Sequence, residues 1–301
     1  MNTSIFHGIL PAIITPLDED GRFAPAAFER LLERLYAAGV DGVYVCGQTG
    51  EGPQLAAEDR KRAADLAVRC SPKGKQVIVH AGAARPAEAV ELARHAASCG
   101  ATAVSSLPPA GGYSFAEVAG YYRMLAAATD APFLVYFFPD VAPAINRVEH
   151  ILELCALPNV IGLKFTDFDL YRLGLFKRAG AVVYNGRDEV LAAGLMMGAD
   201  GGIGSFYNLI PDLFLEVYKL AREDRFAEAR AVQYRINELI QLTLRFPALA
   251  AIKLMLKWSG IDCGPVAAPR RGLTADEESE LRRQLAASSF ADARFAGASG
   301  A

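Results

Sequence analysis

Short apolar runs alternate with longer amphipathic stretches along most of the chain. The runs contain many β-branched residues and are bounded by Gly, Pro, Asn or Asp, which is typical of buried strands. Between them, apolar residues recur at helical spacing, for example in the stretches 25–38, 57–70 and 86–99. We predict eight strands, at residues 9–14, 42–46, 76–80, 103–107, 133–138, 160–165, 182–185 and 201–204.

The regular alternation of strand and helix predicts a parallel sheet. Eight such units within about 210 residues fit a closed (β/α)8 barrel. An open, doubly wound sheet is the alternative, but it typically has a Gly-x-Gly-x-x-Gly turn after its first strand. Residues 11–22 contain no such turn. We therefore predict an α/β fold of the TIM-barrel type.

The chain continues for about 100 residues beyond the eighth expected strand. Helical patterns occur there at 209–221, 225–244, 248–259 and 274–287. The last opens with Thr274-Ala-Asp-Glu277, a capping-box pattern. These helices exceed what one barrel unit needs, so we predict a barrel domain at 1–223 and a helical C-terminal extension at 224–301. The Ala-, Gly- and Ser-rich tail from Ser288 onward is expected to fray.

Composition narrows the class of protein. The 301 residues are 52% hydrophobic and 22% charged, which supports a large core. A net charge of −3 without a basic cluster argues against nucleic acid as a partner. No signal-peptide pattern or long apolar run occurs, so no membrane association is expected. Five cysteines without a C-x-x-C pair are expected to be buried thiols in a reducing compartment, which favours a soluble cytoplasmic protein.

One lysine interrupts an apolar run. Lys164 lies within Val160-Ile-Gly-Leu-Lys-Phe165, the sixth expected strand. Burying an ammonium without a partner costs several kcal/mol, which favours a neutral amine that can form a Schiff base with a carbonyl compound. From this run alone, the alternative is a lysine whose stem lies on the core and whose head reaches water.

Barrel enzymes carry their active sites where the strands end, and several of these strands end in polar groups. Tyr136 ends the fifth strand and can relay protons, while Thr166 shares a strand face with Lys164. The Gly-rich turn 46–52 offers N–H groups and a hydroxyl to a carboxylate. Asp188 faces the substrate or, alternatively, caps the following helix. The candidate substrate-binding residues are Gln48, Thr49, Gly50, Thr166, Gly186, Asp188, Glu189, Ile203 and Ser205.

A lysine, a tyrosine and a carboxylate-binding turn at one end of a barrel predict pyruvate Schiff-base chemistry, with Lys164 and Tyr136 as the catalytic residues. No His, Cys, Asp or Glu cluster has metal-ligand spacing, which disfavours a metal-dependent aldolase. No Gly-x-Ser-x-Gly elbow supports a hydrolase. The four histidines are isolated and are expected to be structural or on the surface. We expect neither a metal nor a cofactor.

Six motifs resemble those of the dihydrodipicolinate synthase / N-acetylneuraminate lyase family of class I aldolases. The resemblance extends from His7 to about Leu285 and implies a barrel with a C-terminal helical bundle, a homotetramer, and a Schiff base between Lys164 and a 2-oxo acid such as pyruvate. The motifs are Gly47-Gln-Thr-Gly-Glu51, Tyr136-x-x-Pro139, Gly162-Leu-Lys-Phe-Thr166, Tyr184-Asn-Gly-Arg-Asp-Glu189, Gly198-Ala-Asp-Gly-Gly-Ile-Gly-Ser205 and Asp262-Cys-Gly-Pro265.

Within the family, the second half of the chain is most similar to N-acetylneuraminate lyase. That resemblance assigns the substrate's polyol portion to Thr166, Gly186, Asp188, Glu189 and Ser205. Dihydrodipicolinate synthase instead has an arginine two residues after Tyr-x-x-Pro, where this chain has a valine, Val141. Valine cannot form the bidentate hydrogen bonds that an arginine makes to a carboxylate, so synthase activity is the second choice after lyase activity.

The first half departs from both subfamilies. Gln48 stands where the carboxylate turn usually offers a hydroxyl, and Gly111-Gly112 stands where a tyrosine usually reaches a neighbouring subunit's site; Tyr113 is the nearest substitute. Phe137 and Phe138 make the pocket more apolar. We predict a lyase or aldolase of the N-acetylneuraminate lyase kind acting on a 2-oxo-3-deoxy sugar acid. The alternatives are the synthase, a sugar-acid dehydratase that uses the same imine, and a non-catalytic binding barrel.

Overall fold

The computed structural model describes residues 3–291 and residue 295. Within them, eight parallel strands form one sheet in the order β1-β8-β7-β6-β5-β4-β3-β2. A bridge between Ala12 and Tyr44 joins β1 to β2, so the sheet closes into the predicted barrel. The strands are β1 (Gly8–Pro11), β2 (Gly42–Val45), β3 (Gln76–His80), β4 (Ala103–Ser106), β5 (Phe133–Phe137), β6 (Val160–Phe165), β7 (Val182–Asn185) and β8 (Gly201–Gly204).

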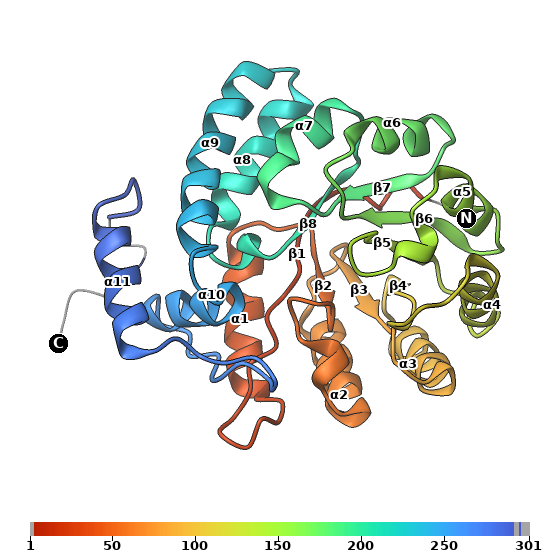
Figure 1. Ribbon diagram of the computed structural model, residues 1–301, viewed down its shortest axis with the longest axis horizontal. Helices are drawn as coiled ribbons and strands as arrows, with labels where there is room; N and C mark the ends of the chain where they lie inside the picture. The colour runs from red at the N-terminus through yellow and green to blue at the C-terminus, as the bar shows by residue number, and fades with distance from the viewer. Residues whose placement is uncertain (1–2, 292–294, 296–301) are drawn as a thin grey trace.

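Helices cover the outside of the barrel, and each of the eight strands is followed by one (Figure 1). These helices are α1 (Pro25–Ala37), α2 (Ala57–Cys70), α3 (Pro86–Ser98), α4 (Phe115–Ala126), α5 (Val148–Cys155), α6 (Leu170–Arg178), α7 (Leu191–Met196) and α8 (Pro211–Arg222). Three further helices, α9 (Phe226–Thr243), α10 (Ala248–Trp258) and α11 (Ala275–Ala286), lie together on one side, next to α1 and α8 (Figure 1). Because α9 packs against both α7 and α8, the division at residue 224 stays a prediction.

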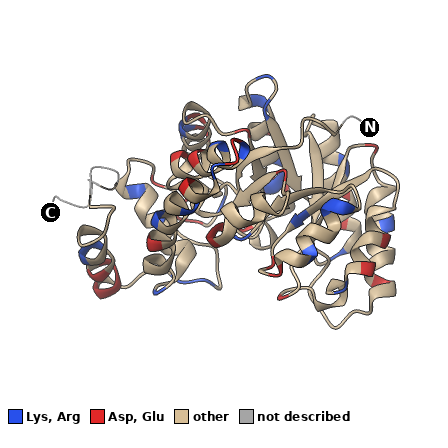
Figure 2. Cartoon of the chain, turned by 90° about the horizontal axis from the view of Figure 1, so that it is seen from above, with Lys and Arg blue, Asp and Glu red and all other residues tan. Residues whose placement is uncertain are grey.

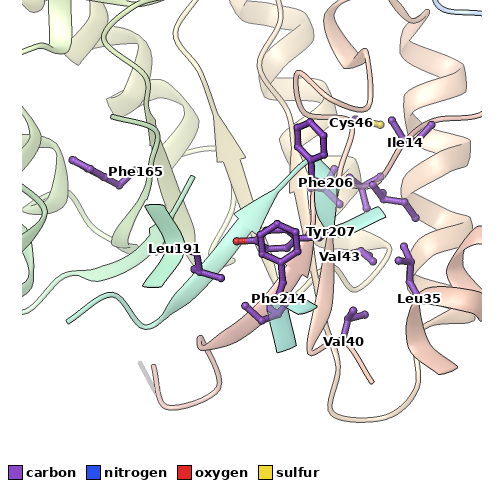
Figure 3. Packing of buried hydrophobic residues seen from close by; sticks show 14 of the residues in the cluster. Ile14, Leu35, Val40, Val43, Cys46, Phe165, Leu191, Phe206, Tyr207 and Phe214 are labelled. Atoms are coloured by element: carbon purple, nitrogen blue, oxygen red, sulfur yellow. The ribbon is translucent and has the colours of Figure 1, made fainter. Parts of the chain in front are cut away.

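Two hydrophobic cores follow from the alternation of side chains along the strands. The larger one lies between the strands and the helices, where residues such as Val43, Phe165 and Phe214 pack (Figure 3). The smaller one fills the barrel interior and contains Tyr44, Tyr136 and other inward-facing residues. The inner core contains hydroxyl-bearing side chains, so the interior can supply chemistry at the ends of the strands.

Several expected boundaries differ from the structure. The first strand ends at Pro11 rather than at residue 14. The N–H groups of Ala12 and Ile13 still donate to Gly204 and Tyr44, but that of Ile14 donates to the side chain of Asn208 (3.1 Å), so pairing with the neighbouring strands stops before residue 14. The expectation of a frayed tail is wrong for residues 288–291, since Phe290 is buried and Ser289 hydrogen-bonds to Glu238. Of the rest of this tail, residues 292–294 and 296–301 lie outside the described residues. The capping box of α11 is confirmed.

The structure agrees only in part with what the composition led us to expect of the cysteines. All five cysteines are unpaired, but only Cys46 and Cys263 are buried, so the expectation of buried thiols is wrong for the other three. Basic and acidic residues are interspersed on the helices (Figure 2). Among the described helices, none is by itself long and apolar enough to cross a membrane; only α9 and α10 together pass that test, as a pair bent by 110°.

Candidate active site

Strand β6 carries its lysine into the barrel because of an irregularity in its pairing with β5. The register shifts after Phe133, which is a β-bulge. At this point Gly162 approaches β7 so closely that a Cβ would come within 1.9 Å of the Val182 carbonyl oxygen, and only glycine fits there. Beyond the bulge, Lys164 pairs with Tyr136 of β5. The two side chains meet inside the barrel.

The amine of Lys164 is held by aromatic groups. Lys164 is 4% exposed, and its Nζ donates a hydrogen bond to Oη of Tyr136 at 2.8 Å. The ring of Tyr44 lies 4.9 Å from Nζ, and its own hydroxyl donates to Ser105. The alternative in which the head of this lysine reaches water is therefore wrong, since the side chain is buried and its amine contacts Tyr136.

A histidine beneath the site has a structural role. The N–H of Leu107 donates to Nε2 of His80 (3.0 Å), which leaves Nδ1–H to donate to the carbonyl of Cys46 (3.1 Å). Burial lowers the pKa of His80 well below its usual value, and the positive charges of Arg60 and Lys164 lower it further. The ring is thus neutral with both nitrogens occupied, as predicted for an isolated structural histidine.

A cavity of about 190 Å³ opens over Lys164 at the carboxyl ends of the strands. Two larger cavities, of about 360 and 520 Å³, contain neither Lys164 nor Tyr136. Every site residue predicted from the sequence except Gly50 lines the cavity over Lys164. The predicted residues in its wall are Gln48, Thr49, Tyr136, Lys164, Thr166, Gly186, Asp188, Glu189, Ile203 and Ser205, and the additional ones are Phe138, Arg187, Gly204 and Phe206.

The turn after β2 is joined to the turn after β8 across the cavity. The hydroxyls of Thr49 and Ser205 are 2.6 Å apart. Gly50 is buried beside Thr49, where a Cβ would come within 2.9 Å of the Ile13 carbonyl oxygen. Glycine here allows the turn to pack against the segment that follows β1, and the predicted role of the Gly50 N–H in binding a carboxylate stays a prediction.

One hydroxyl in the cavity wall has no hydrogen-bond partner among the described residues. This is the buried Oγ1 of Thr166. A Cβ on residue 186 would lie 2.2 Å from this oxygen, so Gly186 provides the room for it. An unpaired buried hydroxyl costs about 1–3 kcal/mol, which a bound polar ligand would recover.

Asp188 is the buried carboxyl of the site. Its Oδ2 accepts a hydrogen bond from the N–H of Phe206, after β8, at 2.8 Å. The alternative in which it caps the helix that follows it is wrong, since that helix has no side-chain cap. Burial raises the pKa of Asp188 to about 7, against the lowering effect of the Phe206 N–H. Burial therefore favours the protonated form of Asp188 far more than it would for an exposed aspartate.

Replacing Asp188 by asparagine is expected to make stability less sensitive to pH. The pKa is raised on folding, so wild-type stability is greatest below the unfolded value and falls as pH rises through about 7. Relative to wild type, Asp188→Asn should gain up to roughly 4 kcal/mol between pH 4 and pH 8. Thermal unfolding at several pH values measures the difference.

A control carboxylate should give the opposite trend. Lys257 lowers the pKa of Asp262, so Asp262→Asn should lose stability relative to wild type as pH rises from the acid range. A difference between Asp188→Asn and wild type that does not change with pH would contradict the raised pKa.

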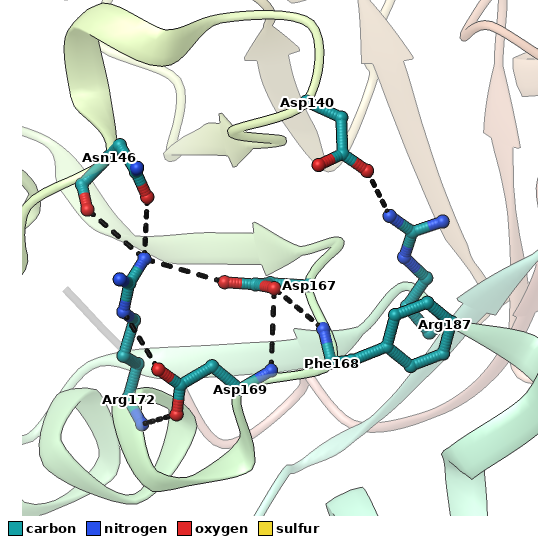
Figure 4. Close-up of polar contacts among 7 residues, drawn as sticks. All are labelled: Asp140, Asn146, Asp167, Phe168, Asp169, Arg172 and Arg187. Atoms are coloured by element: carbon teal, nitrogen blue, oxygen red, sulfur yellow. Dashed lines mark hydrogen bonds and ion pairs between the residues drawn. The ribbon is translucent and has the colours of Figure 1, made fainter.

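Arg187, Gly204 and Phe206 line the cavity but were not predicted from the sequence, and Arg187 is the charged one among them. Its guanidinium lies 5.3 Å from the ring of Phe138 and 4.5 Å from that of Phe168. Nη2 donates to Asp140 at 2.5 Å, which joins the loops after β5 and β7 (Figure 4). An arginine directly before two acidic residues, within a recognised motif, was the available signal.

Two positions singled out in the sequence lie away from the lysine cavity. Val141 lines a neighbouring, largely apolar cavity of about 150 Å³, which Gln48 also touches. Tyr113 is 43% exposed and is absent from the wall of the Lys164 cavity. Tyr113 is therefore not part of the lysine cavity of its own chain, and its predicted role at a neighbouring subunit's site stays a prediction.

Comparison with known proteins agrees with this geometry. Residues 5–288 match the Dihydrodipicolinate synthetase family. The N-acetylneuraminate lyase of Rhizobium meliloti is 35% identical over 285 residues, covering 93% of this chain and 94% of that one. The N-acetylneuraminate lyase of Mediterraneibacter gnavus is 31% identical over 294 residues, covering 95% and 93%.

Among solved structures, a catalytic lysine mutant of the sialic acid aldolase of Ruminococcus gnavus superposes with a TM-score of 0.91. The two chains are 28% identical, and the match covers 99% of this chain and 98% of that one. Sequence, fold and site agree on one assignment. The chain belongs to the dihydrodipicolinate synthetase family and is a pyruvate-dependent class I aldolase.

Proposed function

We propose that the chain is an N-acetylneuraminate lyase-like enzyme that cleaves a 2-oxo-3-deoxy sugar acid into pyruvate and an aldehyde. The observation that carries the proposal is the contact between the amine of Lys164 and the phenol of Tyr136, at 2.8 Å, inside a cavity lined with hydroxyl and carboxyl groups. The similarity to two N-acetylneuraminate lyases supports the substrate class.

Lys164 would form the imine. Its unprotonated amine adds to the 2-oxo carbon, and Tyr136 gives its phenol proton to the departing hydroxyl, so that water leaves a protonated imine beside a phenolate. The phenolate of Tyr136 then takes the proton of the C4 hydroxyl, the C3–C4 bond breaks, and its electron pair moves toward the iminium to give an enamine and the aldehyde. Protonation of C3 and hydrolysis release pyruvate and restore the amine. No cofactor or metal takes part in this scheme.

The two ends of the cavity suit the two parts of the substrate. Thr49, with the N–H groups of the turn from Gln48 to Gly50, would hold the carboxylate beside the imine carbon. The sugar portion would face Thr166 with its unpaired hydroxyl, and a further set of residues on the β7 and β8 side. That set is Gly186, Asp188, Glu189, Ile203 and Ser205.

A substrate panel tests the proposal. Purified protein is incubated with N-acetylneuraminate, with 2-keto-3-deoxygluconate, and with aspartate semialdehyde plus pyruvate. Release of pyruvate from either sugar acid is the expected result. Loss of water from 2-keto-3-deoxygluconate without pyruvate would indicate a dehydratase, and consumption of aspartate semialdehyde would contradict the argument from Val141. No turnover of any member would favour a binding barrel.

The resemblance to the family also leads us to propose a homotetramer in the cytoplasm. Light scattering should give a solution mass near four times the 32.2 kDa of the chain. A mass equal to that of one chain would contradict the assembly.

A further inference from the structure

The helices after the barrel reach both loops of the proposed substrate site. We propose that Lys253 of α10 is a positioning residue for the 2-oxo-acid end of the site: through its buried ion pair with Glu51 it holds the turn that carries Thr49. This inference rests on the proposed function, because it takes the turn at residues 47–51 as the carboxylate-binding element.

The turn is held in an unfavourable conformation. Cys46 and Glu51, at its two ends, have φ values of +57° and +54°, in the left-handed region that side-chain-bearing residues rarely adopt. Such conformations persist only where the surroundings impose them. Within the turn, Thr49 contacts Ser205 across the cavity. Something outside the turn must therefore fix its shape.

Glu51 anchors the turn to the C-terminal segment. It is fully buried, its Oε1 accepts a hydrogen bond from the N–H of Ala267 (2.7 Å), and its Oε2 lies 2.7 Å from Nζ of Lys253. Lys253 is 3% exposed and also donates to the Pro265 carbonyl (2.6 Å). Two residues 202 positions apart are thus joined by an ion pair that solvent does not screen.

Such a pair is poorly explained by stability alone. Buried ion pairs often contribute little net stability compared with apolar side chains of the same volume, because both charges lose their hydration. What the pair does provide is attachment, since one oxygen of Glu51 accepts a hydrogen bond from Ala267 and the other lies in an ion pair with Lys253. A displacement of the turn by even 1 Å would move Thr49 away from the imine carbon, and misplacements of that size can strongly reduce binding and rate.

The neighbouring helix α9 provides a matched comparison. Gln233 is buried, accepts from the N–H of Ala192 (3.0 Å) and donates to the carbonyl of Asp188 (2.9 Å). It therefore supports the loop of the proposed sugar end, and within the described part of the chain none of its hydrogen bonds goes to the carboxylate turn. Loss of Gln233 removes buried hydrogen bonds at the other end of the site without leaving a buried charge unpaired.

The experiment measures pyruvate binding without any aldehyde. The full-length protein is incubated with increasing pyruvate and a fixed amount of borohydride, and the concentration for half-maximal trapping at Lys164 is determined. Lys253→Met is expected to raise this concentration about tenfold or more. Gln233→Met and Lys257→Met, an exposed ion-paired lysine on the same helix, are expected to leave it within about twofold of wild type.

Further variants separate positioning from folding. Lys253→Arg keeps the charge and should restore much of the wild-type value. Should Lys253→Met fail to fold, Glu51→Gln, which keeps an acceptor for Ala267, is expected to show the same rise in half-saturating pyruvate. Equal shifts in Gln233→Met and Lys253→Met, or a lower melting temperature with unchanged half-saturation, would overturn the positioning role.

Failure of the proposed function gives a different result. If wild-type protein forms no adduct at Lys164 at any pyruvate concentration, the Schiff-base function fails and the inference fails with it. If wild type is trapped but Lys253→Met responds like Lys257→Met, only the positioning role fails.

Discussion

Replacing Lys164 by methionine is expected to lower turnover by about 10⁴-fold or more, because no other group in the cavity can form the imine. Methionine has a similar length and no ammonium, so the barrel should stay folded. The loss falls on kcat rather than on binding of the sugar portion. Steady-state kinetics on whichever substrate of the panel is turned over measures it.

Lys177 provides the control for this variant. It is also partly buried and pairs with Asp200 at 2.6 Å, but it lies at a different cavity from Lys164. Lys177→Met is expected to change stability slightly and to keep turnover within a few-fold of wild type. Substantial activity in Lys164→Met with an intact fold would contradict the Schiff-base mechanism.

Replacing Tyr136 by phenylalanine is expected to lower kcat by about 10²- to 10⁴-fold, the usual contribution of a general acid or base. The ring would still pack edge-to-face on Tyr44, with centroids 6.1 Å apart, and stack on Phe138 at 6.0 Å. Because the lysine is retained, trapping of pyruvate at Lys164 should persist. A large fall in kcat together with unchanged adduct formation would indicate that Tyr136 transfers protons and is not essential for forming the imine.

Tyr44→Phe is the matched control. Tyr44 is fully buried in the same inner core, and its ring also lies near the lysine amine, but its hydroxyl donates to Ser105 rather than contacting Lys164. Its kcat is expected to stay within about tenfold of wild type. If Tyr44→Phe lost as much as Tyr136→Phe, packing rather than proton transfer would explain the effect.

The fold was largely predictable because the local sequence patterns and the order of the elements indicate the same architecture. Apolar runs become strands, amphipathic stretches become helices, and the absence of a Gly-x-Gly-x-x-Gly turn argued correctly for a barrel. The end of the first strand was misplaced, because the hydrogen bond from Ile14 to the side chain of Asn208 involves residues far apart in sequence. Phe290, in a tail of small residues, belongs to the larger core and lies 5.4 Å from the guanidinium of Arg235 in α9.

The site was predictable where a reactive side chain lies at the carboxyl end of a predicted strand. Lys164, Tyr136 and Thr166 lie on one face because side chains alternate along strands, and the structure brings them to one cavity. Their roles stay predictions until kinetics test them. Arg187 was missed because its place in the wall depends on two aromatic rings and on Asp140 from another loop.

The contacts through which the C-terminal helices hold the substrate-binding loops could not be predicted from sequence patterns. Nothing near Glu51 marks it as the partner of Lys253, and the pair exists only because the C-terminal segment returns to the turn after β2. Likewise, the raised pKa of Asp188 depends on burial that a Gly-x-Asp-Glu pattern does not reveal. Both features arise from tertiary packing.

The proposed mechanism requires a covalent bond between Lys164 and a 2-oxo acid. Wild-type protein is incubated with pyruvate, reduced with borohydride and digested, and the masses of its peptides are measured. We expect a reduced pyruvyl adduct on the peptide containing Lys164, and none in Lys164→Met. Absence of an adduct at Lys164 in active, folded protein would contradict this mechanism.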